Sequence, residues 1–297
     1  MSVYFRQHHL VATDLSPQKS WSVLSPIESA IKAKVEQKGI PLKNWDIRIN
    51  YGIKTGYNDA FIIDRKTRDL LINKSSKNAE IIRPILKGRN INRYYANASD
   101  MWIINSHNGL KRAGIPRIDV KSDYPVVYDY FLQFEKRMTQ RQDQGDHWTN
   151  LRNCAYVDHF QREKIIWLEL TDSPKFAYDN EQKIIEATAF MMTGENLKYL
   201  CAFLNTKICE WYFDKITASS GAGTNRWKKI YIERLPVPYI SASSQRLFIE
   251  LLDQIIERKR ANKPFQDLEE ELNAMAFRLF DLTQEEVGLV TSSLLSR

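Results

Sequence analysis

Hydrophobic residues first repeat with helical spacing just after Ser25. Ser25–Glu28 has the sequence of a capping box, with proline at the first helical position. The apolar stripe that follows consists of Ile27, Ile31 and Val35. Gly39, with Pro41 two residues later, ends the pattern, because glycine closes helices and proline cannot continue them. A helix is therefore predicted from Ser25 to Gly39.

Alternating apolar and polar residues predict strands further along the chain. Asp46–Asn50 alternates isoleucine with polar neighbours, as a half-buried strand does. A turn bracketed by Gly52 and Gly56 leads to Ala60–Ile63, which we expect to be its partner strand, with Asp64–Arg68 as the exit turn. Other strand-like runs are Met101–Asn105, Lys164–Leu170 and Phe176–Tyr178.

Helical spacing dominates the C-terminal part. One helix is predicted over Pro125–Arg141, and two adjacent helices over about Glu195–Ile216. After Pro238 come two amphipathic helices around Ser244–Lys259 and Leu268–Phe280, and a second capping box at Thr283–Glu286 starts a short third helix. The fold class is therefore predicted to be α+β: a mixed α/β body with twisted sheets, followed by a C-terminal helical hairpin. The domains expected are an N-terminal extension (1–20), a body (21–240) and the hairpin (241–297).

Charge is distributed unevenly along the 297 residues. The chain has 43 Lys and Arg against 36 Asp and Glu, a net charge of +7. Residues 245–297 contain ten acids and seven bases, so the remainder of the chain has a net charge of +10. This basic excess favours a polyanionic partner for the body.

Several classes of protein are disfavoured. No apolar run approaches the roughly 18 residues that a membrane span needs. The N-terminus has no apolar core of the signal-peptide type. The thiols Cys154, Cys201 and Cys209 are scattered, and no histidines have H-E-x-x-H spacing, so no metal site is assigned. We expect a cytoplasmic protein without membrane contact.

The chemistry of an enzyme is also not found. The chain has no N-P-P-aromatic tetrapeptide of adenine methyltransferases, no G-x-S-x-G elbow and no Walker A motif. Gly221–Asn225 follows a helix rather than a strand, which is the wrong context for a nucleotide-binding turn. Glu36–Lys38 and Asp119–Lys121 have the (D/E)-x-K spacing of nuclease sites, but lie at a helix end and in a loop-like stretch. No catalytic residue is assigned.

Four stretches suit contact with nucleic acid. In Asn50–Asp64 two glycines permit close approach of the backbone. In Ile81–Tyr95 lysine, arginine and asparagine side chains are interleaved with tyrosines. Lys215–Arg234 has a net charge of +4, and Gln140–His147 is rich in amides that can read adenine. For each stretch an ordinary exposed turn or loop stays an open alternative. The candidate DNA-binding residues are Lys54, Thr55, Tyr57, Asn58, Lys87, Arg89, Asn90, Arg93, Gln140, Gln142, Asn225, Arg226, Lys228 and Lys229.

Taken in order, these stretches resemble one family. The TaqI-like C-terminal specificity domain is similar to this chain in the segments GIKTGYNDAFIID, EIIRPILKGRNINRYY, RQDQGDHWTNLRNCAYVDHFQREKIIW, YLCAFLNTKICEWYFDKI and YIERLPVP. The likeness runs from about Trp21 to Leu282. That domain is the target-recognition part of bifunctional type II (type IIG) restriction–modification enzymes and related adenine-N6 DNA methyltransferases.

The resemblance implies a division of labour. The specificity domain holds double-stranded DNA and reads its sequence, while a methyltransferase domain, often preceded by a nuclease, performs catalysis. Matching segments imply that Lys54, Thr55, Lys87, Arg89 and Arg93 lie on the DNA side. No cofactor is expected in this chain, because S-adenosylmethionine and Mg²⁺ belong to the catalytic part. The chain would then be a fragment or a separate specificity subunit.

Three functions stay open from the sequence. The first is a DNA target-recognition domain without catalytic motifs of its own. The second is a protein-interaction module whose C-terminal helices dock a separate methyltransferase or nuclease subunit. The third is an intact nuclease or methyltransferase of an unfamiliar type.

Overall fold

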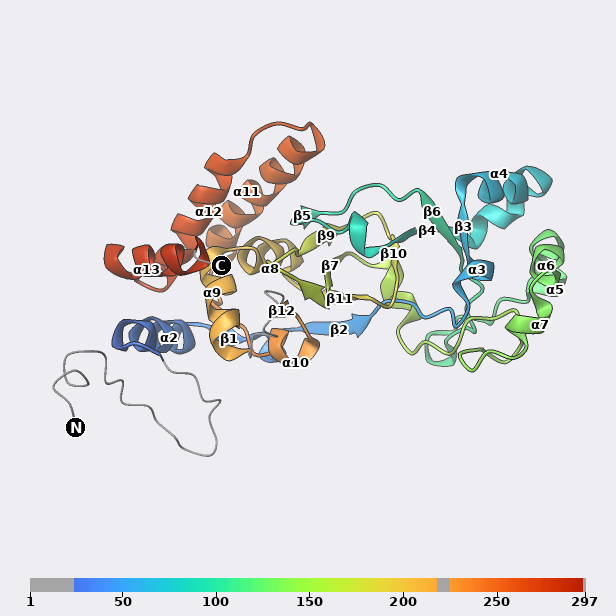
Figure 1. Ribbon diagram of the computed structural model, residues 1–297, viewed down its shortest axis with the longest axis horizontal. Coiled ribbons are helices and arrows are strands. Elements are labelled where there is room, and N and C mark those ends of the chain that lie inside the picture. The colour runs from blue at the N-terminus through green and yellow to red at the C-terminus, as the bar shows by residue number, and fades with distance from the viewer. Residues whose placement is uncertain (1–23, 218–224, 296–297) are drawn as a thin grey trace, which may run out of the picture. The chain divides into compact units, whose positions relative to one another are not determined.

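The computed structural model describes residues 24–217 and 225–295 (Figure 1). Contacts between residues divide the chain into two units, and several segments of the sequence alternate between them. The first unit contains the described parts of Met1–Ile47, Leu170–Pro174 and Lys198–Arg297. The second contains Arg48–Glu169 and Lys175–Leu197.

The second unit is built on two sheets. The larger has the strand order β2-β11-β7-β9-β5. Its strands are β2 (Ile47–Tyr51), β11 (Ala189–Gly194), β7 (Lys164–Leu168), β9 (Ala177–Asp179) and β5 (Tyr94–Tyr95). The central strands β7 and β11 are almost continuously apolar and buried, as strands covered on both faces are. The predicted strands at Asp46–Asn50, Lys164–Leu170 and Phe176–Tyr178 are thus confirmed apart from their ends.

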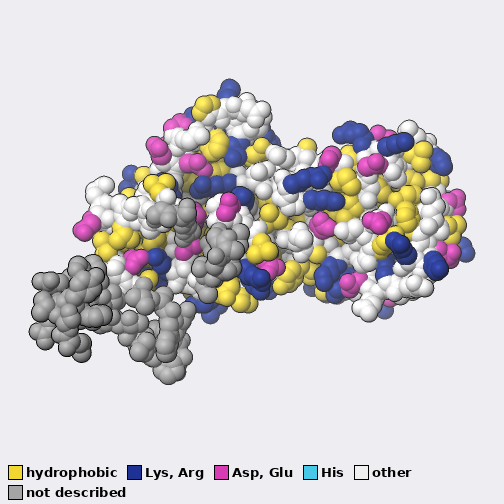
Figure 2. Space-filling model, viewed as in Figure 1, with side chains coloured by type: hydrophobic (Ala, Val, Ile, Leu, Met, Phe, Trp, Pro, Cys, Tyr) yellow, Lys and Arg dark blue, Asp and Glu magenta, His cyan; other side chains and the backbone are white. Residues whose placement is uncertain are grey.

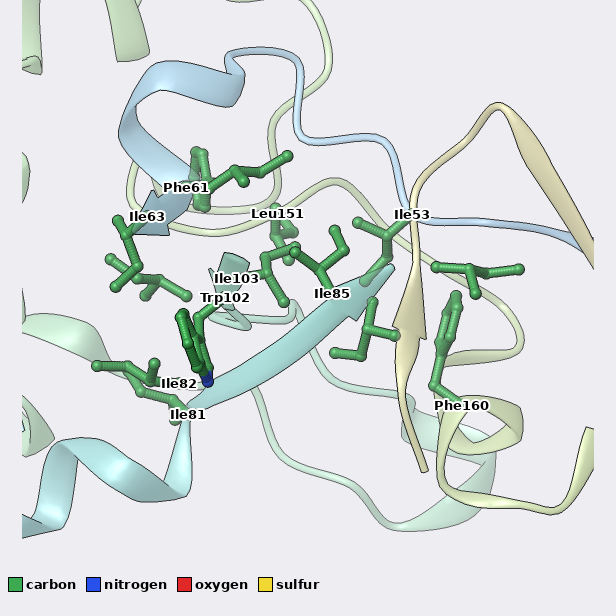
Figure 3. Close-up of a cluster of buried hydrophobic side chains, with 14 of the residues drawn as sticks. Ile53, Phe61, Ile63, Ile81, Ile82, Ile85, Trp102, Ile103, Leu151 and Phe160 are labelled. Carbon is green, nitrogen blue, oxygen red and sulfur yellow. The ribbon is translucent and has the colours of Figure 1, made fainter. Parts of the chain in front are cut away.

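The smaller sheet of this unit has the order β10-β4-β6-β3. Its strands are β10 (Ile184–Ile185), β4 (Ile82–Leu86), β6 (Met101–Ile104) and β3 (Ile62–Asp64). One hydrophobic cluster contains Ile85 and Ile103 from this sheet together with Ile166 and Met191 from the larger sheet, so the core joins the two (Figure 3). Burial of this apolar surface is the main term that holds the unit together.

Two local predictions are wrong. Ala60–Ile63 is not a partner strand of β2, because its first two residues belong to α3 (Asn58–Phe61) and its last two to β3, which pairs with β6. The expected exit turn is the start of α4 (Arg65–Lys74), where the Asp64 carboxylate accepts a hydrogen bond from Thr67 N at 2.8 Å. Aspartate favours both turns and helix N-caps, and here Asp64 is an N-cap.

The helix predicted over Pro125–Arg141 is interrupted. Following α5 (Val120–Asp123), the structure has α6 (Pro125–Leu132) and α7 (Glu135–Met138). Phe134 N donates to Phe131 O, three residues back, which is a tighter turn than an α-helix makes. The Phe134 ring packs against Tyr130 at 5.4 Å and Tyr57 at 6.0 Å. Tertiary aromatic contacts at the break thus accompany the change of direction.

The first unit is mainly helical. Its elements are α2 (Pro26–Lys38), most of α8 (Leu197–Leu204), α9 (Lys207–Ile216), α10 (Lys229–Ile232), α11 (Ala242–Arg260), α12 (Gln266–Leu279), α13 (Gln284–Leu295) and the strand pairs β1 (Ile40–Pro41) with β13 (Pro236–Val237) and β12 (Asn225–Arg226) with β8 (Leu170–Thr171). The capping box at Ser25–Glu28 is present, with both reciprocal hydrogen bonds. A second one at Thr283–Glu286 begins α13. The predicted C-terminal hairpin of α11 and α12 and the α+β class are confirmed.

Candidate nucleic-acid interface

The loop from Gly52 to Asn58 is attached to the core of the second unit at one end. Ile53 is buried in the hydrophobic cluster (Figure 3), and its N–H donates to Ile185 O at 2.7 Å. A Cβ on Gly52 would lie 2.1 Å from Glu186 O, so only glycine permits this close approach of two backbones. The next residue, Lys54, is exposed. The core thus positions a solvent-facing lysine.

The predicted donors after Lys54 differ in their surroundings. Thr55 is 3% exposed, and its hydroxyl donates to Asn58 Oδ1 at 2.5 Å and accepts from Tyr57 N at 3.2 Å. Asn58 is exposed, and its Nδ2 donates to Glu186 Oε1 at 2.8 Å. Tyr57 is half-buried, with its hydroxyl 3.3 Å from a guanidinium nitrogen of Arg137. Thr55 therefore shapes the turn.

A buried arginine joins this loop to the glutamine-rich segment. The Arg141 guanidinium donates to the carbonyls of Thr55, Trp148 and Asn150, and its Cζ lies 4.5 Å from the Phe61 ring centroid. Burial lowers the pKa of Arg141 to about 10, which leaves it a cation at neutral pH. On either side of it, Gln140 and Gln142 are exposed. Two stretches 86 positions apart in sequence are thus brought together.

The glycine at position 56 shows how tightly these segments meet. Its φ is +71°, a left-handed conformation, and a Cβ there would lie 2.8 Å from Asp143 O. Both observations require glycine at this position.

The Lys87–Arg93 segment lies on the other side of β10. Strand β4 pairs with β10 in parallel, and the pairing continues one residue further, where Glu186 N donates to Leu86 O at 3.2 Å. Ile53 forms a bridge with the same Glu186. Asn90 is buried; its Oδ1 accepts from Lys87 N at 3.0 Å and its Nδ2 donates to Ala98 O at 3.3 Å. This amide holds the turn in shape.

The cations of that segment are held in different ways. Arg89 is exposed and forms an ion pair with Asp100 at 3.0 Å. Lys87 and Arg93 are half-buried, and the Arg93 guanidinium lies 5.3 Å from the Tyr94 ring centroid. The hydrogen bond from Arg89 is the main reason that the pKa of Asp100 is lowered.

The loop borders a shallow hollow of about 480 Å³. It is lined by Ile53, Lys54, Thr55, Gly56, Tyr57, Asn58, Asp143, Glu186, Ala187 and Thr188. The sequence does not predict that the carboxylates of Asp143 and Glu186 line the same hollow as Lys54, because these residues are far from Lys54 along the chain. On the visible face in Figure 2, Lys and Arg side chains likewise alternate with Asp and Glu and with apolar side chains. The positive charge there is in separate small groups.

The remaining candidates belong to the first unit. Arg226 is exposed in β12, opposite Leu170, and Lys228 is half-buried. Lys229 Nζ lies 3.6 Å from the Glu233 carboxylate. Between these cations Trp227 is buried and stacks on Phe213 with ring centroids 3.8 Å apart, which anchors the segment to α9. Asn225 is described only by its backbone in β12, and residues 218–224 lie outside the described part.

No group of three or more His, Cys, Asp and Glu side chains in residues 24–217 and 225–295 is placed to hold a metal ion. In the same ranges, no helix combines the length and apolar character needed to cross a membrane.

Solved structures of restriction enzymes are similar to this chain in fold. The type IIL restriction–modification enzyme MmeI, in its complex with DNA, matches with a TM-score of 0.58 and 11% identity, over 86% of this chain and 35% of the enzyme. The type IIG restriction endonuclease BpuSI matches with a TM-score of 0.50 and 14% identity, over 86% of this chain and 32% of the endonuclease. This chain therefore spans about a third of each enzyme.

At the level of sequence, no curated protein matches the chain. The family model of the TaqI-like C-terminal specificity domain does match, over residues 83–237. This range includes the Lys87–Arg93 segment, the glutamine-rich segment and the basic segment before β13. Because the match covers more than half of the chain, and because the fold is shared with two restriction–modification enzymes, this chain belongs to the family of TaqI-like C-terminal specificity domains.

Proposed function

We propose that this chain binds double-stranded DNA in a sequence-specific manner, as the target-recognition part of a type II restriction–modification or adenine-N6 methyltransferase system. The observation that supports this most is membership of the specificity-domain family, in a chain whose second unit ties the Gly52–Asn58 loop to Arg141, the residue between Gln140 and Gln142. The MmeI structure contains DNA, which is consistent with a similar role here.

Phosphate contacts would supply most of the affinity. In the second unit Lys54 and Arg89 are exposed, and Lys87 and Arg93 are partly so. In the first unit the cations of Arg226–Lys229 would add a further contact. Because the positive charge is in small groups, binding would depend on several local contacts, each of which releases counterions.

Base reading is assigned to amide side chains. Gln140 and Gln142 are exposed on both sides of the buried Arg141, which fixes the backbone that carries them. Glutamine can pair with the adenine edge through two hydrogen bonds. Tyr57 and Asn58 belong to the Gly52–Asn58 loop and would contact DNA from its edge. Thr55 and Asn90 are assigned a positioning role, since their side chains bind neighbouring loop atoms.

Catalysis would be performed by another part of the system. The family resemblance assigns the methyltransferase and nuclease activities, and with them S-adenosylmethionine and Mg²⁺, to a catalytic domain or subunit outside this sequence. The chain would supply recognition to that partner.

The proposal is tested by the salt dependence of DNA binding. We expect Lys54→Ala with Lys87→Ala to lower the slope of log K against log salt by about 2, since each phosphate contact contributes about 0.9. Lys263→Ala, an exposed lysine between α11 and α12, should leave the slope unchanged. Fluorescence anisotropy with labelled duplexes measures both. Absence of salt-dependent binding to any duplex would contradict the proposal.

Recognition of a specific DNA sequence by the chain requires a separate measurement. Selection of bound duplexes from a random pool should yield a preferred site, and Gln140→Ala with Gln142→Ala should relax the preference at specific positions while the salt slope is kept. Equal enrichment of all sequences by the full chain would mean that the chain binds DNA without reading it.

A second function has its own structural support. A groove of about 480 Å³ runs along α11 and α12, and its apolar lining includes Leu247, which is 55% exposed. Such a surface favours docking of the methyltransferase or nuclease part. Leu247→Asp should then abolish a complex with that part in size-exclusion chromatography with light scattering. An unchanged complex would exclude this groove.

A further inference from the structure

A second, more enclosed cavity of about 590 Å³ adjoins Lys54 within the second unit. Ile53, Lys54 and Ala187 line both this cavity and the shallow hollow. The cavity continues along residues 151–157, and Leu151 and Val157 contribute buried apolar side chains. Its volume is within the roughly 300–1,000 Å³ that is typical of small-ligand sites.

The ionic groups of this cavity favour an anion. Lys54 and Arg152 are its two cations, and no carboxylate is found among the described residues that line it. Both side chains are exposed, and Arg152 forms an ion pair with Asp143 at 2.9 Å. The shallow hollow differs, because it contains Asp143 and Glu186. An anionic group is therefore better accommodated in the cavity.

Two polar side chains of the cavity present hydrogen-bond donors. His107 Nδ1 accepts from Gly109 N at 3.1 Å, and burial lowers the pKa of His107, so the neutral ring carries its proton on Nε2. Asn153 Oδ1 accepts from Asn108 Nδ2, which leaves its own amide nitrogen as the donor. Donors of this kind suit carbonyl oxygens and ring nitrogens of a heterocycle.

Aromatic rings complete the lining. The Tyr51 ring is 51% exposed and is supported from behind by Phe190, with ring centroids 4.5 Å apart. Tyr156 lines the same cavity and packs on Phe160 at 6.2 Å. A ring held in this way offers a preformed surface on which a flat ligand can stack.

We propose that this cavity binds a single nucleotide, with the base beside Tyr51 and Tyr156 and the phosphate at Lys54 and Arg152. The nucleotide is an unpaired one in a DNA strand that the adjacent loops hold, so this inference rests on the proposed function. A free mononucleotide has the same chemistry, and the experiment separates the two sources.

Binding of three duplexes to the full chain tests the inference by fluorescence anisotropy. The three duplexes share one sequence. The first is fully paired, the second contains one bulged nucleotide, and the third contains an abasic residue at the position of the bulge. We expect the chain to bind the duplex with the bulged nucleotide about tenfold more tightly than the duplex with the abasic bulge, because stacking of the base on an aromatic ring is lost in the latter. Tyr51→Leu should remove most of this difference, whereas Tyr239→Leu, which changes an exposed tyrosine of the first unit, should retain it.

A second arm uses free nucleotides. Isothermal titration of the chain with adenosine and thymidine monophosphates, with and without Tyr51→Leu, measures the cavity in the absence of DNA. Equal affinity for the bulged and abasic duplexes, together with no Tyr51-dependent binding of monophosphates, would overturn the inference. If the paired duplex still binds in that case, the proposed function stands. Tyr51-dependent monophosphate binding without a bulge preference would support the cavity and assign it to free nucleotides.

Discussion

Replacing Arg141 by leucine should release the two loops that carry the candidate base-reading residues. The guanidinium donates to three carbonyls, from Thr55, Trp148 and Asn150, and lies against the Phe61 ring. Leucine keeps part of the apolar stem and removes every donor. The buried carbonyls of both loops would then lose a common partner.

The size of the effect follows from opposing contributions. Hydrogen bonds from a charged donor each contribute about 1.5–3 kcal/mol, and a desolvated cation–π contact contributes up to about 2 kcal/mol. Against this, the variant no longer bears the cost of burying the guanidinium, which is visible in the lowered pKa of Arg141. We expect a net loss of about 3 kcal/mol in the local stability of the loops, which is about a hundredfold in their opening equilibrium.

Native-state hydrogen exchange of loop amides is the suitable assay. Ile53 N donates to Ile185 O at 2.7 Å and Leu151 N to Ser106 O at 2.9 Å, so both amides report opening. Arg141→Leu should accelerate their exchange about a hundredfold, and Arg141→Lys should have a smaller effect, because one ammonium cannot span three carbonyls. Gln142→Ala serves as the matched control. Exchange rates in Arg141→Leu equal to those of the control would refute the reasoning.

Three further predictions concern other parts of the chain. Lys228→Ala with Lys229→Ala should weaken binding to all duplexes and lower the salt slope by about 2, as measured by anisotropy. Asn90→Ala should reduce the urea-derived free energy of unfolding by about 1–2 kcal/mol, because a buried turn loses its hydrogen bonds. Burial opposes ionisation of Glu286, but its ion pair with Lys34 lowers the pKa of its carboxyl below the usual 4.5. The ionised carboxylate therefore stabilises the fold above the usual pKa, and this stabilisation is lost as the pH falls through the lowered pKa. Glu286→Gln should flatten this loss of stability at acid pH, as measured by urea unfolding at several pH values.

Matched variants make these predictions discriminating. Lys263→Ala is the control for the double lysine change, and Asn97→Ala, an exposed asparagine, is the control for Asn90. Glu285→Gln, at an exposed position next to Glu286, should leave the pH dependence of unfolding unchanged. Any prediction for which variant and control behave alike is contradicted.

Features that depend on a few neighbouring residues were predictable from the sequence alone. Capping boxes at Ser25–Glu28 and Thr283–Glu286 marked the starts of two helices, and apolar periodicity located α11 and α12. Both signals act within one or two turns of chain, so they are legible without tertiary structure. The family resemblance was visible for the same reason, since its motifs are contiguous.

Which distant segments meet became visible in the folded chain and not before. Strand β3 pairs with β6 rather than with the nearer β2, because side-chain burial in the common core selects the pairing. Asn58 contacts Glu186 across 128 positions of sequence, and Arg141 reaches Thr55 across 86. Residue types suited to DNA contact thus divide into exposed groups and inward-facing ones. No local pattern encodes that division, because it depends on carbonyls and carboxylates that distant segments supply.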